Sequence, residues 1–303
     1  MKLISTILSF ILAVSVGVFP KSYQHVSENA ELDFVVISDI HMEGNNPDRF
    51  RDFPQILLDI NGAARKNDAL VMLGDNTMNG QHIEYTFLTL SLRLFSRIQN
   101  NLLVMGNHEI FTEENGYEKG LSKFLTYGKM IMGEKYEKPY YSREVDGFTF
   151  IVMSTEADMG VTAYISPEQI SWLDSTLAEA SKDGKPAFVF CHFPIDGTVE
   201  TLWPQGLMGE QSGEVLSVLK KYKNVFFFSG HLHNAVDYSS VKRIDGVTFV
   251  DVPSVLSDHS VGTTPTRGTG YCVEVHDGKV ELRPRNFISG EWFDDLCVTV
   301  ELV

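Results

Sequence analysis

Short, continuous apolar runs recur along this chain, and each ends abruptly in polar residues. The runs are four or five residues long and are separated by longer amphipathic stretches; five of them are 34–37, 69–73, 102–105, 187–191 and 225–228. Runs of this kind are typical of β-strands that are covered on both faces. The strand ends of open α/β sheets meet at one edge, where ligand sites gather. The residues that directly follow the runs are therefore the candidates for a functional site.

The stretches between the runs predict helices. Helical periodicity extends over 54–66 and over 83–97. A third helix is predicted to begin after Ser166 and to end near Ala180, because Pro167 suits the first helical position and Gln169 the third position of a capping box.

Three Asp-Gly pairs, at residues 146, 245 and 277, lie between alternating apolar segments and predict tight hairpins. The chain should therefore contain antiparallel strands beside the parallel ones. A two-sheet sandwich flanked by helices, which is an α/β fold, explains this mixture better than a single doubly wound sheet does.

Side chains that bind metal ions follow the apolar runs. They are Asp39, His41, Asp75, Asn107, His192, His231 and His233. Two divalent ions a few ångström apart need nitrogen and oxygen donors from several directions and one carboxylate that bridges them, for which Asp75 is the candidate. Alternate residues of an extended chain point to the same side, so the pair Asp39 and His41 and the pair His231 and His233 can each converge on metal.

Glycines stand directly before several of these donors, at Gly74, Gly106 and Gly230. Glycine permits a sharp turn or a close approach of the backbone to a neighbouring group. A crowded site of the predicted kind requires both.

Taken in order, the polar blocks are Asp39-x-His41, Gly74-Asp75, Gly106-Asn107-His108-Glu109, His192 and Gly230-His231-x-His233. This series resembles the calcineurin-like metallophosphoesterase family. The resemblance implies a four-layer αββα sandwich of two mixed β-sheets flanked by helices. It also implies a single catalytic domain, which we expect over residues 31–303.

The resemblance further implies a centre of two divalent metal ions. The implied ligands of one ion are Asp39, His41 and His233. The implied ligands of the other are Asn107, His192 and His231. Asp75 would touch both ions, while His108 would stand near the leaving group without binding metal, so that Asn107 and His108 also contact the substrate. A mixed nitrogen and oxygen donor set suits manganese, iron or zinc. Met78 stands where the similar purple acid phosphatases have tyrosine, so a tyrosinate-bound ferric ion is not expected.

The implied activity is hydrolysis of a phosphomonoester or a phosphodiester, with cyclic nucleotides among the candidates. A hydroxide that bridges the two ions would attack phosphorus, and His108 would protonate the departing alkoxide. The alternative is a catalytically inactive scaffold that uses the same fold to bind proteins. The presence of His108 and of every ligand position favours the enzyme.

Substrate choice is expected to reside outside the ligand blocks. The candidate segments are 111–141 and 195–213, whose aromatic residues, Trp203 among them, could stack on a substrate or could simply pack. Arg267 is a candidate for binding phosphate. The formal net charge of −15 argues against duplex nucleic acid as a partner, whereas a small phosphorylated substrate is compatible with bound cations.

Residues 1–22 have the layout of a signal peptide, with Lys2 before a nearly uncharged stretch over 3–19. Cleavage near Ser15 or Gly17 is favoured over retention as an N-terminal membrane anchor. We therefore expect the protein to be exported, either secreted or held at the outer side of the cell membrane. In an oxidising compartment Cys272 and Cys297 could form a bridge, whereas Cys191, at the end of an apolar run, is expected to be an inert packed thiol.

Overall fold

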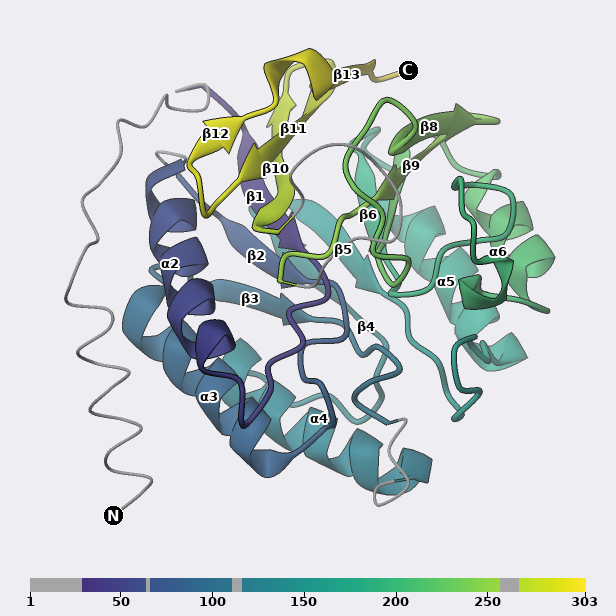
Figure 1. Ribbon diagram of the computed structural model, residues 1–303. Helices are drawn as coiled ribbons and strands as arrows, with labels where there is room; N and C mark the ends of the chain where they lie inside the picture. The colour runs from purple at the N-terminus through teal and green to yellow at the C-terminus, as the bar shows by residue number, and fades with distance from the viewer. Residues whose placement is uncertain (1–28, 64–65, 111–115, 257–266) are drawn as a thin grey trace.

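The computed structural model describes residues 29–63, 66–110, 116–256 and 267–303. Within these ranges the chain forms two mixed β-sheets that pack face to face, with helices on both outer surfaces (Figure 1). The predicted α/β class and its four αββα layers are confirmed. The predicted signal segment, residues 1–22, lies outside the described residues.

The first sheet has the strand order β12-β11-β10-β1-β2-β3, with β13 paired to β11. Its strands are β1 (Leu32–Ile37), β2 (Ala69–Met72), β3 (Asn100–Leu103), β10 (Thr269–His276), β11 (Lys279–Asn286), β12 (Glu291–Trp292) and β13 (Val298–Glu301). Strands β1, β2 and β3 run parallel, and β10 joins them antiparallel to β1. The parallel strands therefore deliver the loops after β1, β2 and β3 to the same edge.

The second sheet has the strand order β4-β5-β6-β7-β9-β8. Its strands are β4 (Tyr141–Val145), β5 (Phe148–Val152), β6 (Ala187–Phe190), β7 (Val225–Ser229), β8 (Val241–Ile244) and β9 (Val247–Asp251). The four central strands are parallel, and β4 and β8 pair antiparallel at the two edges. The three Asp-Gly pairs occupy the turns β4–β5, β8–β9 and β10–β11, which confirms the predicted hairpins.

Helices cover the outer faces of both sheets (Figure 1). On the first sheet lie α2 (Pro47–Ala63), α3 (His82–Phe95) and α4 (Gly116–Met132); on the second lie α5 (Pro167–Ala180) and α6 (Ser212–Leu219). Two short 3-10 turns are η1 (Pro204–Gly206) and η2 (Asp294–Leu296). No helix in the described part of the chain combines the length and apolarity needed to cross a bilayer.

Phenylalanines fill the space between the two sheets. Phe188 and Phe190 of β6 point toward the first sheet, whereas the alternate residues Ala187 and Val189 point toward α5 and α6. The ring of Phe34 in β1 meets Phe188 edge-on, with 4.9 Å between ring centroids. Both faces of these strands are buried, which explains why their sequences are continuously apolar.

Helix α2 begins at Pro47 and not near Pro54, where we predicted its start. Pro54 therefore lies inside the helix, where it lacks the N–H that would bond to the preceding turn. The buried stripe that includes Phe50, Phe53 and Leu57 runs through this position. Packing of that stripe against the sheet outweighs the local cost of proline.

Helix α5 has the predicted N-cap but only part of the predicted capping box. The Ser166 hydroxyl accepts the backbone N–H of Gln169 at 3.1 Å, as expected. The Ser166 N–H, however, donates to Glu156 at 2.8 Å, and the Gln169 side chain bonds to the backbone of Ser154 instead. The Gln169 side chain thus ties the helix to the end of β5.

Much of the segment 111–141, predicted to be a substrate loop, is helix α4. Its glycines weaken the helical signal in the sequence, but one of them is needed for packing. A Cβ on Gly120 would lie 2.7 Å from the Glu109 carbonyl oxygen, so glycine allows α4 to approach the loop after β3 closely. Residues 111–115 lie outside the described residues.

The three cysteines are free thiols, so the bridge between Cys272 and Cys297 that we considered is not formed. Cys272 is buried in β10, whereas Cys297 is exposed before β13. Burial raises the pKa of Cys191 to about 12, as expected for a packed, inert thiol.

Candidate metal centre

The predicted ligands occupy loops that leave the strand ends in a strained backbone conformation. Five of them have left-handed φ values between 45° and 71°: Asp39, His41, Asp75, His231 and His233. Non-glycine residues rarely adopt this conformation, which costs about 1 kcal/mol or more for each residue. Such strain concentrates at functional sites, where the surrounding structure holds it in place.

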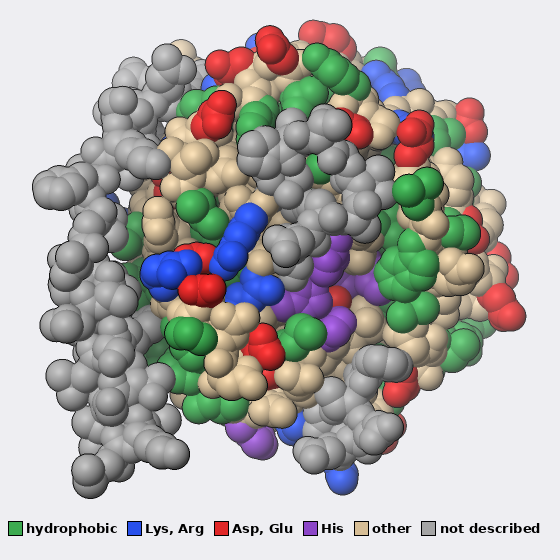
Figure 2. Space-filling model, viewed as in Figure 1, with side chains coloured by type: hydrophobic (Ala, Val, Ile, Leu, Met, Phe, Trp, Pro, Cys, Tyr) green, Lys and Arg blue, Asp and Glu red, His purple; other side chains and the backbone are tan. Residues whose placement is uncertain are grey.

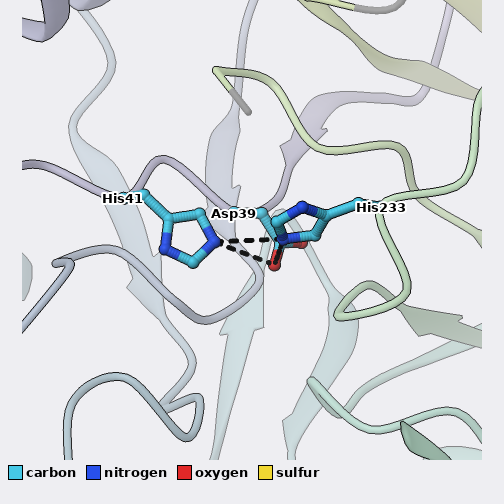
Figure 3. Close-up of side chains that lie close together, drawn as sticks. All are labelled: Asp39, His41 and His233. Atoms are coloured by element: carbon cyan, nitrogen blue, oxygen red, sulfur yellow. Dashed lines mark hydrogen bonds and ion pairs between the residues drawn. The ribbon is translucent and has the colours of Figure 1, made fainter. Parts of the chain in front are cut away.

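The first cluster joins the loop after β1 to the loop after β7 (Figure 3). His233 Nε2 lies 3.0 Å from Asp39 Oδ1 and 3.0 Å from His41 Nε2. One donor atom from each of these three side chains can therefore face the same point, because the three atoms lie within 4.8 Å of one another. This is the group that we predicted to hold one ion.

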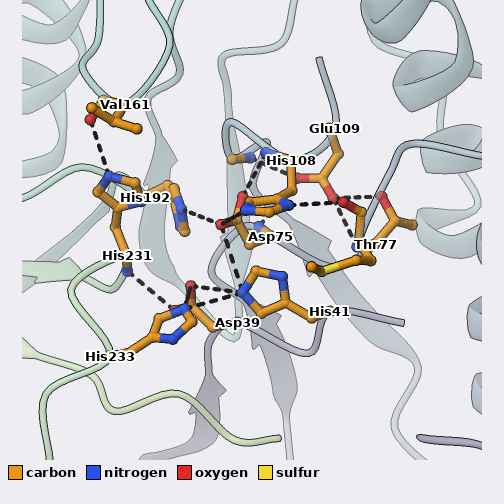
Figure 4. A network of polar contacts seen from close by, with 12 residues as sticks. Asp39, His41, Asp75, Thr77, His108, Glu109, Val161, His192, His231 and His233 are labelled. Atoms are coloured by element: carbon orange, nitrogen blue, oxygen red, sulfur yellow. Dashed lines mark hydrogen bonds and ion pairs between the residues drawn. The ribbon is translucent and has the colours of Figure 1, made fainter. Parts of the chain in front are cut away.

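The second cluster contains Asp75, His192 and His231, whose donor atoms also lie within 4.8 Å of one another. His192 Nε2 is 3.2 Å from Asp75 Oδ2. The same carboxylate oxygen is 3.8 Å from His41 Nε2, so Asp75 lies between the two clusters (Figure 4). Its position is the one required of a bridging carboxylate.

Asn107 Oδ1 is a buried acceptor to which no described residue donates, and His192 Nε2 is directed at the carboxylate of Asp75. The orientation of His192 is fixed, because its Nδ1–H donates to the carbonyl of Leu73 at 2.9 Å and leaves Nε2 to face Asp75 or a cation. His231 is held similarly through Nε2, which donates to the carbonyl of Val161 at 3.0 Å. Such bonds are typical of histidines that bind metals. The donor set therefore fits a pair of divalent cations.

The charges of the site also favour cations. Burial alone would raise the pKa of Asp39 and Asp75, but neighbouring histidines hold both pKa values well below the ordinary range. Although burial disfavours its charged form, Asp75 raises the pKa of His192 to about 9. Burial, assisted by His192, lowers the pKa of His231 to about 4. A divalent cation in contact with both Asp75 and His192 would replace the proton on His192.

His108 stands beside the clusters and is more accessible than the predicted ligands around it. Its side chain is 28 % exposed, compared with 2 % for Asp75, and its Nε2 lies 3.9 Å from Asp75 Oδ2. Its Nδ1–H donates to the carbonyl of Met78 at 2.8 Å, which fixes the ring orientation. The structure thus brings all eight predicted site residues to one edge of the sandwich, while their individual roles stay predictions.

The family model for calcineurin-like phosphoesterases matches residues 32–235, a range that includes every predicted ligand. The chain belongs to the calcineurin-like phosphoesterase family. No curated protein sequence matches the chain.

Several solved structures resemble this calcineurin-like phosphoesterase. A dimetal phosphatase from Danio rerio is 15% identical, with a TM-score of 0.64 over 91% of this chain and 100% of that one. A predicted phosphoesterase from Streptococcus pneumoniae is 12% identical, with a TM-score of 0.43 over 91% and 99%. Vps29 from Entamoeba histolytica, in complex with zinc, is 11% identical, with a TM-score of 0.36 over 89% and 99%. At these identities, the likeness to the first structure establishes the fold alone.

Glu109 holds two loops of the phosphoesterase centre together through hydrogen bonds. This role was not identified from the sequence. The buried Glu109 carboxylate accepts the backbone N–H groups of Asp75, Thr77 and Gly106 and the hydroxyl of Thr77, at distances from 2.7 to 3.1 Å. Burial, followed by the charge of Asp75, raises the pKa of Glu109 to about 7. Glu109 therefore ties the loop after β2 to the loop after β3. Its place at the end of the block Gly106–Glu109 is the signal that could have identified it.

Two glycines allow the ligand loops to pack this closely. A Cβ on Gly106 would lie 2.2 Å from Asp75 Oδ1, and a Cβ on Gly74 would lie 2.4 Å from His192 Nδ1. Neither contact is sterically possible, so the predicted need for glycine before these donors is met at both positions.

Gly106→Ala is expected to lower phosphoesterase activity by more than about 10-fold, because the added Cβ must displace the Asp75 carboxylate. Steady-state kinetics, with thermal unfolding measured in parallel, would check this. Gly213→Ala is the matched control, since a Cβ there meets nothing within 4 Å. Full activity in Gly106→Ala would show that the position of Asp75 is not critical.

Other residues singled out in the sequence lie in different surroundings. Arg267 forms an ion pair with Asp52, and its predicted contact with phosphate stays a prediction. The Trp203 ring lies 5.0 Å from the ring of His231, so the segment 195–213 does reach the centre.

Proposed function

We propose that this protein hydrolyses phosphate esters with the help of two divalent cations. The observation that carries the proposal is the position of the Asp75 carboxylate between His192 of the second cluster and His41 of the first, beside Asn107 Oδ1, to which no described residue donates. When bound, the cations would supply Lewis acidity and activate water as a nucleophile at neutral pH. The proposed ligands are Asp39, His41, His233, Asn107, His192, His231 and Asp75.

The side chains around the donors have separate tasks in this proposal. His108, oriented by the Met78 carbonyl, would give a proton to the departing alkoxide oxygen through Nε2. The Asn107 amide N–H would hold a non-bridging phosphoryl oxygen while its Oδ1 faces a cation. Glu109 would keep Asp75 in place through the backbone of both loops. The strained, complete donor set favours this enzyme over a scaffold that only binds proteins.

Purified protein supplied with manganese, zinc or iron(II) is expected to hydrolyse p-nitrophenyl phosphate or bis-p-nitrophenyl phosphate. The comparison of the two substrates would separate monoesterase from diesterase activity, and a screen that includes cyclic nucleotides would narrow the natural substrate. A chelator should abolish the activity and added metal should restore it. If neither substrate is cleaved with any of these metals, the proposed function is wrong.

We also propose that the protein is exported, on the sequence pattern of residues 1–22 alone. Fractionation of expressing cells, with N-terminal sequencing of the recovered protein, would test this. Recovery outside the cell membrane is expected, either with a new N-terminus after cleavage or as a membrane-held full chain. A full-length chain confined to the cytoplasm would contradict export.

A further inference from the structure

A cavity of about 430 Å³ opens at the segment that directly follows the proposed ligand His233. Its walls come from three parts of the chain: residues 200–202, the segment that begins at Asn234 after β7, and Asp251 at the end of β9. Two of these parts continue directly into the centre. Asn234 follows the proposed ligand His233, and Leu202 precedes Trp203, whose ring contacts His231. A group attached to a phosphoryl moiety at the centre therefore has a cavity within reach.

Two residues that line the cavity each carry a buried oxygen that accepts no hydrogen bond from any described residue. These oxygens are Asp251 Oδ1 and Asn234 Oδ1, on side chains that are 6% and 9% exposed. The Asn234 amide cannot be turned round to supply a donor, because its nitrogen already donates to Asp251 Oδ2 at 2.7 Å and to the Glu200 carbonyl at 3.0 Å. Buried acceptors without partners are costly. The cavity is therefore lined by two residues whose acceptors lack a donor, beside the hydroxyl groups of Thr201, Ser239 and Ser240.

The charge of the cavity is negative. Glu200 is paired with Lys242 at 3.1 Å, whereas in the described part of the chain no Lys or Arg pairs with Asp251 or Asp237. Burial, with smaller contributions from Asp39 and Asp237, raises the pKa of Asp251 to about 7. This carboxylate would be stabilised by a positively charged partner that also donates hydrogen bonds.

An organic ammonium group fits these requirements better than a metal ion does. Among the described residues, Asp251 belongs to none of the groups of three side chains whose donor atoms converge closely enough to hold a metal. An ammonium group has three N–H donors, and the cavity has space for the carbon chain that carries it. The ammonium group would thus donate hydrogen bonds to the buried acceptors and would not need the several converging ligands that a metal ion requires.

We propose that the cavity binds a primary ammonium group on the substrate, so that the preferred substrates are phosphate esters of amino alcohols. This inference rests on the proposed hydrolase function. Asp251 Oδ1 and Asn234 Oδ1 accept two of the ammonium hydrogens, and the cavity thereby selects the group that is esterified to phosphate. Asp251 and Asn234 act as specificity residues and take no part in the chemical step.

The substrate test compares O-phosphoethanolamine with propyl phosphate, which has the same number of heavy atoms but no charge on its chain. The corresponding p-nitrophenyl diesters replace them if only diesters are cleaved. Wild-type protein is expected to favour the amine by about 10-fold or more in kcat/KM, as a charge-assisted hydrogen bond predicts. Asp251→Asn should bring this ratio close to one, because asparagine has no charge with which to bind the ammonium group.

Asp245→Asn, in the exposed β8–β9 turn, is the matched control and should keep the wild-type ratio. Titration calorimetry with ethanolamine tests the cavity independently of turnover, since wild type should bind it and Asp251→Asn should not. A ratio near one in wild type, or a ratio that Asp251→Asn leaves unchanged, would overturn the inference. Asp251-dependent binding of calcium chloride in place of ethanolamine would also overturn it. Failure to cleave any ester would instead refute the proposed function. Calorimetry would then still show whether the cavity binds an ammonium group.

Discussion

Asp75→Asn is expected to lower kcat/KM for p-nitrophenyl phosphate or its diester by more than about 100-fold. Changing a residue that merely supports a metal ligand costs about 10- to 100-fold, whereas Asp75 belongs to the second donor cluster and lies 3.8 Å from His41 of the first. Asparagine keeps the size of the side chain but loses its charge and one of its two acceptor oxygens. Both cations would therefore be held more weakly, and metal content should fall along with activity.

Asp277→Asn provides the control for this substitution, because Asp277 is exposed in the β10–β11 turn and Asn-Gly supports such a turn equally well. Activity and metal content should be those of the wild type. If Asp75→Asn retained both as well, Asp75 could not be the residue that bridges the two ions.

His108→Ala is expected to lower kcat by about 10²- to 10⁴-fold, the usual contribution of a positioned general acid. Metal content should stay at the wild-type level, since His108 is not among the proposed ligands. Kinetics combined with elemental analysis would separate these two effects. The control is His82→Ala, because His82 is exposed on α3 and bonds to Tyr127.

Equal turnover in His108→Ala and wild type would remove the proposed role of His108. Loss of a metal ion in this variant would instead make His108 a ligand, an arrangement compatible with its cluster with His41 and Asp75.

The central strands were predictable from the sequence. A β-strand that is covered on both faces must be apolar throughout, and such a run is easily recognised. Phe226 and Phe228 face the other sheet, whereas Phe227 faces the helices, so every residue of that run is buried. Helix α4 was not predictable in the same way, since its glycines are unfavourable in an isolated helix and make sense only where another segment approaches. Helix α2 likewise tolerates Pro54 because of its packing against the sheet.

The residue types of the candidate site were predictable from the sequence. The backbone conformation and the hydrogen bonds that hold these residues in place were not. Asp39, Asp75 and His192 could be identified because they follow apolar runs. The left-handed backbone at Asp39 and Asp75 is not encoded by glycine at those positions and is imposed by the fold. Glu109 acts through hydrogen bonds to backbone N–H groups, which leave no pattern in the sequence. The pairing of Asn234 with Asp251 depends on two strands meeting in space, so it too required the structure.

Elemental analysis of an active preparation, expressed per chain, tests the metal centre most directly. About two equivalents of manganese, iron or zinc are expected per chain, as two-ion catalysis requires. His192→Ala should release at least one of them, and activity should fall in proportion. An active preparation that contains no transition metal would contradict the two-ion centre.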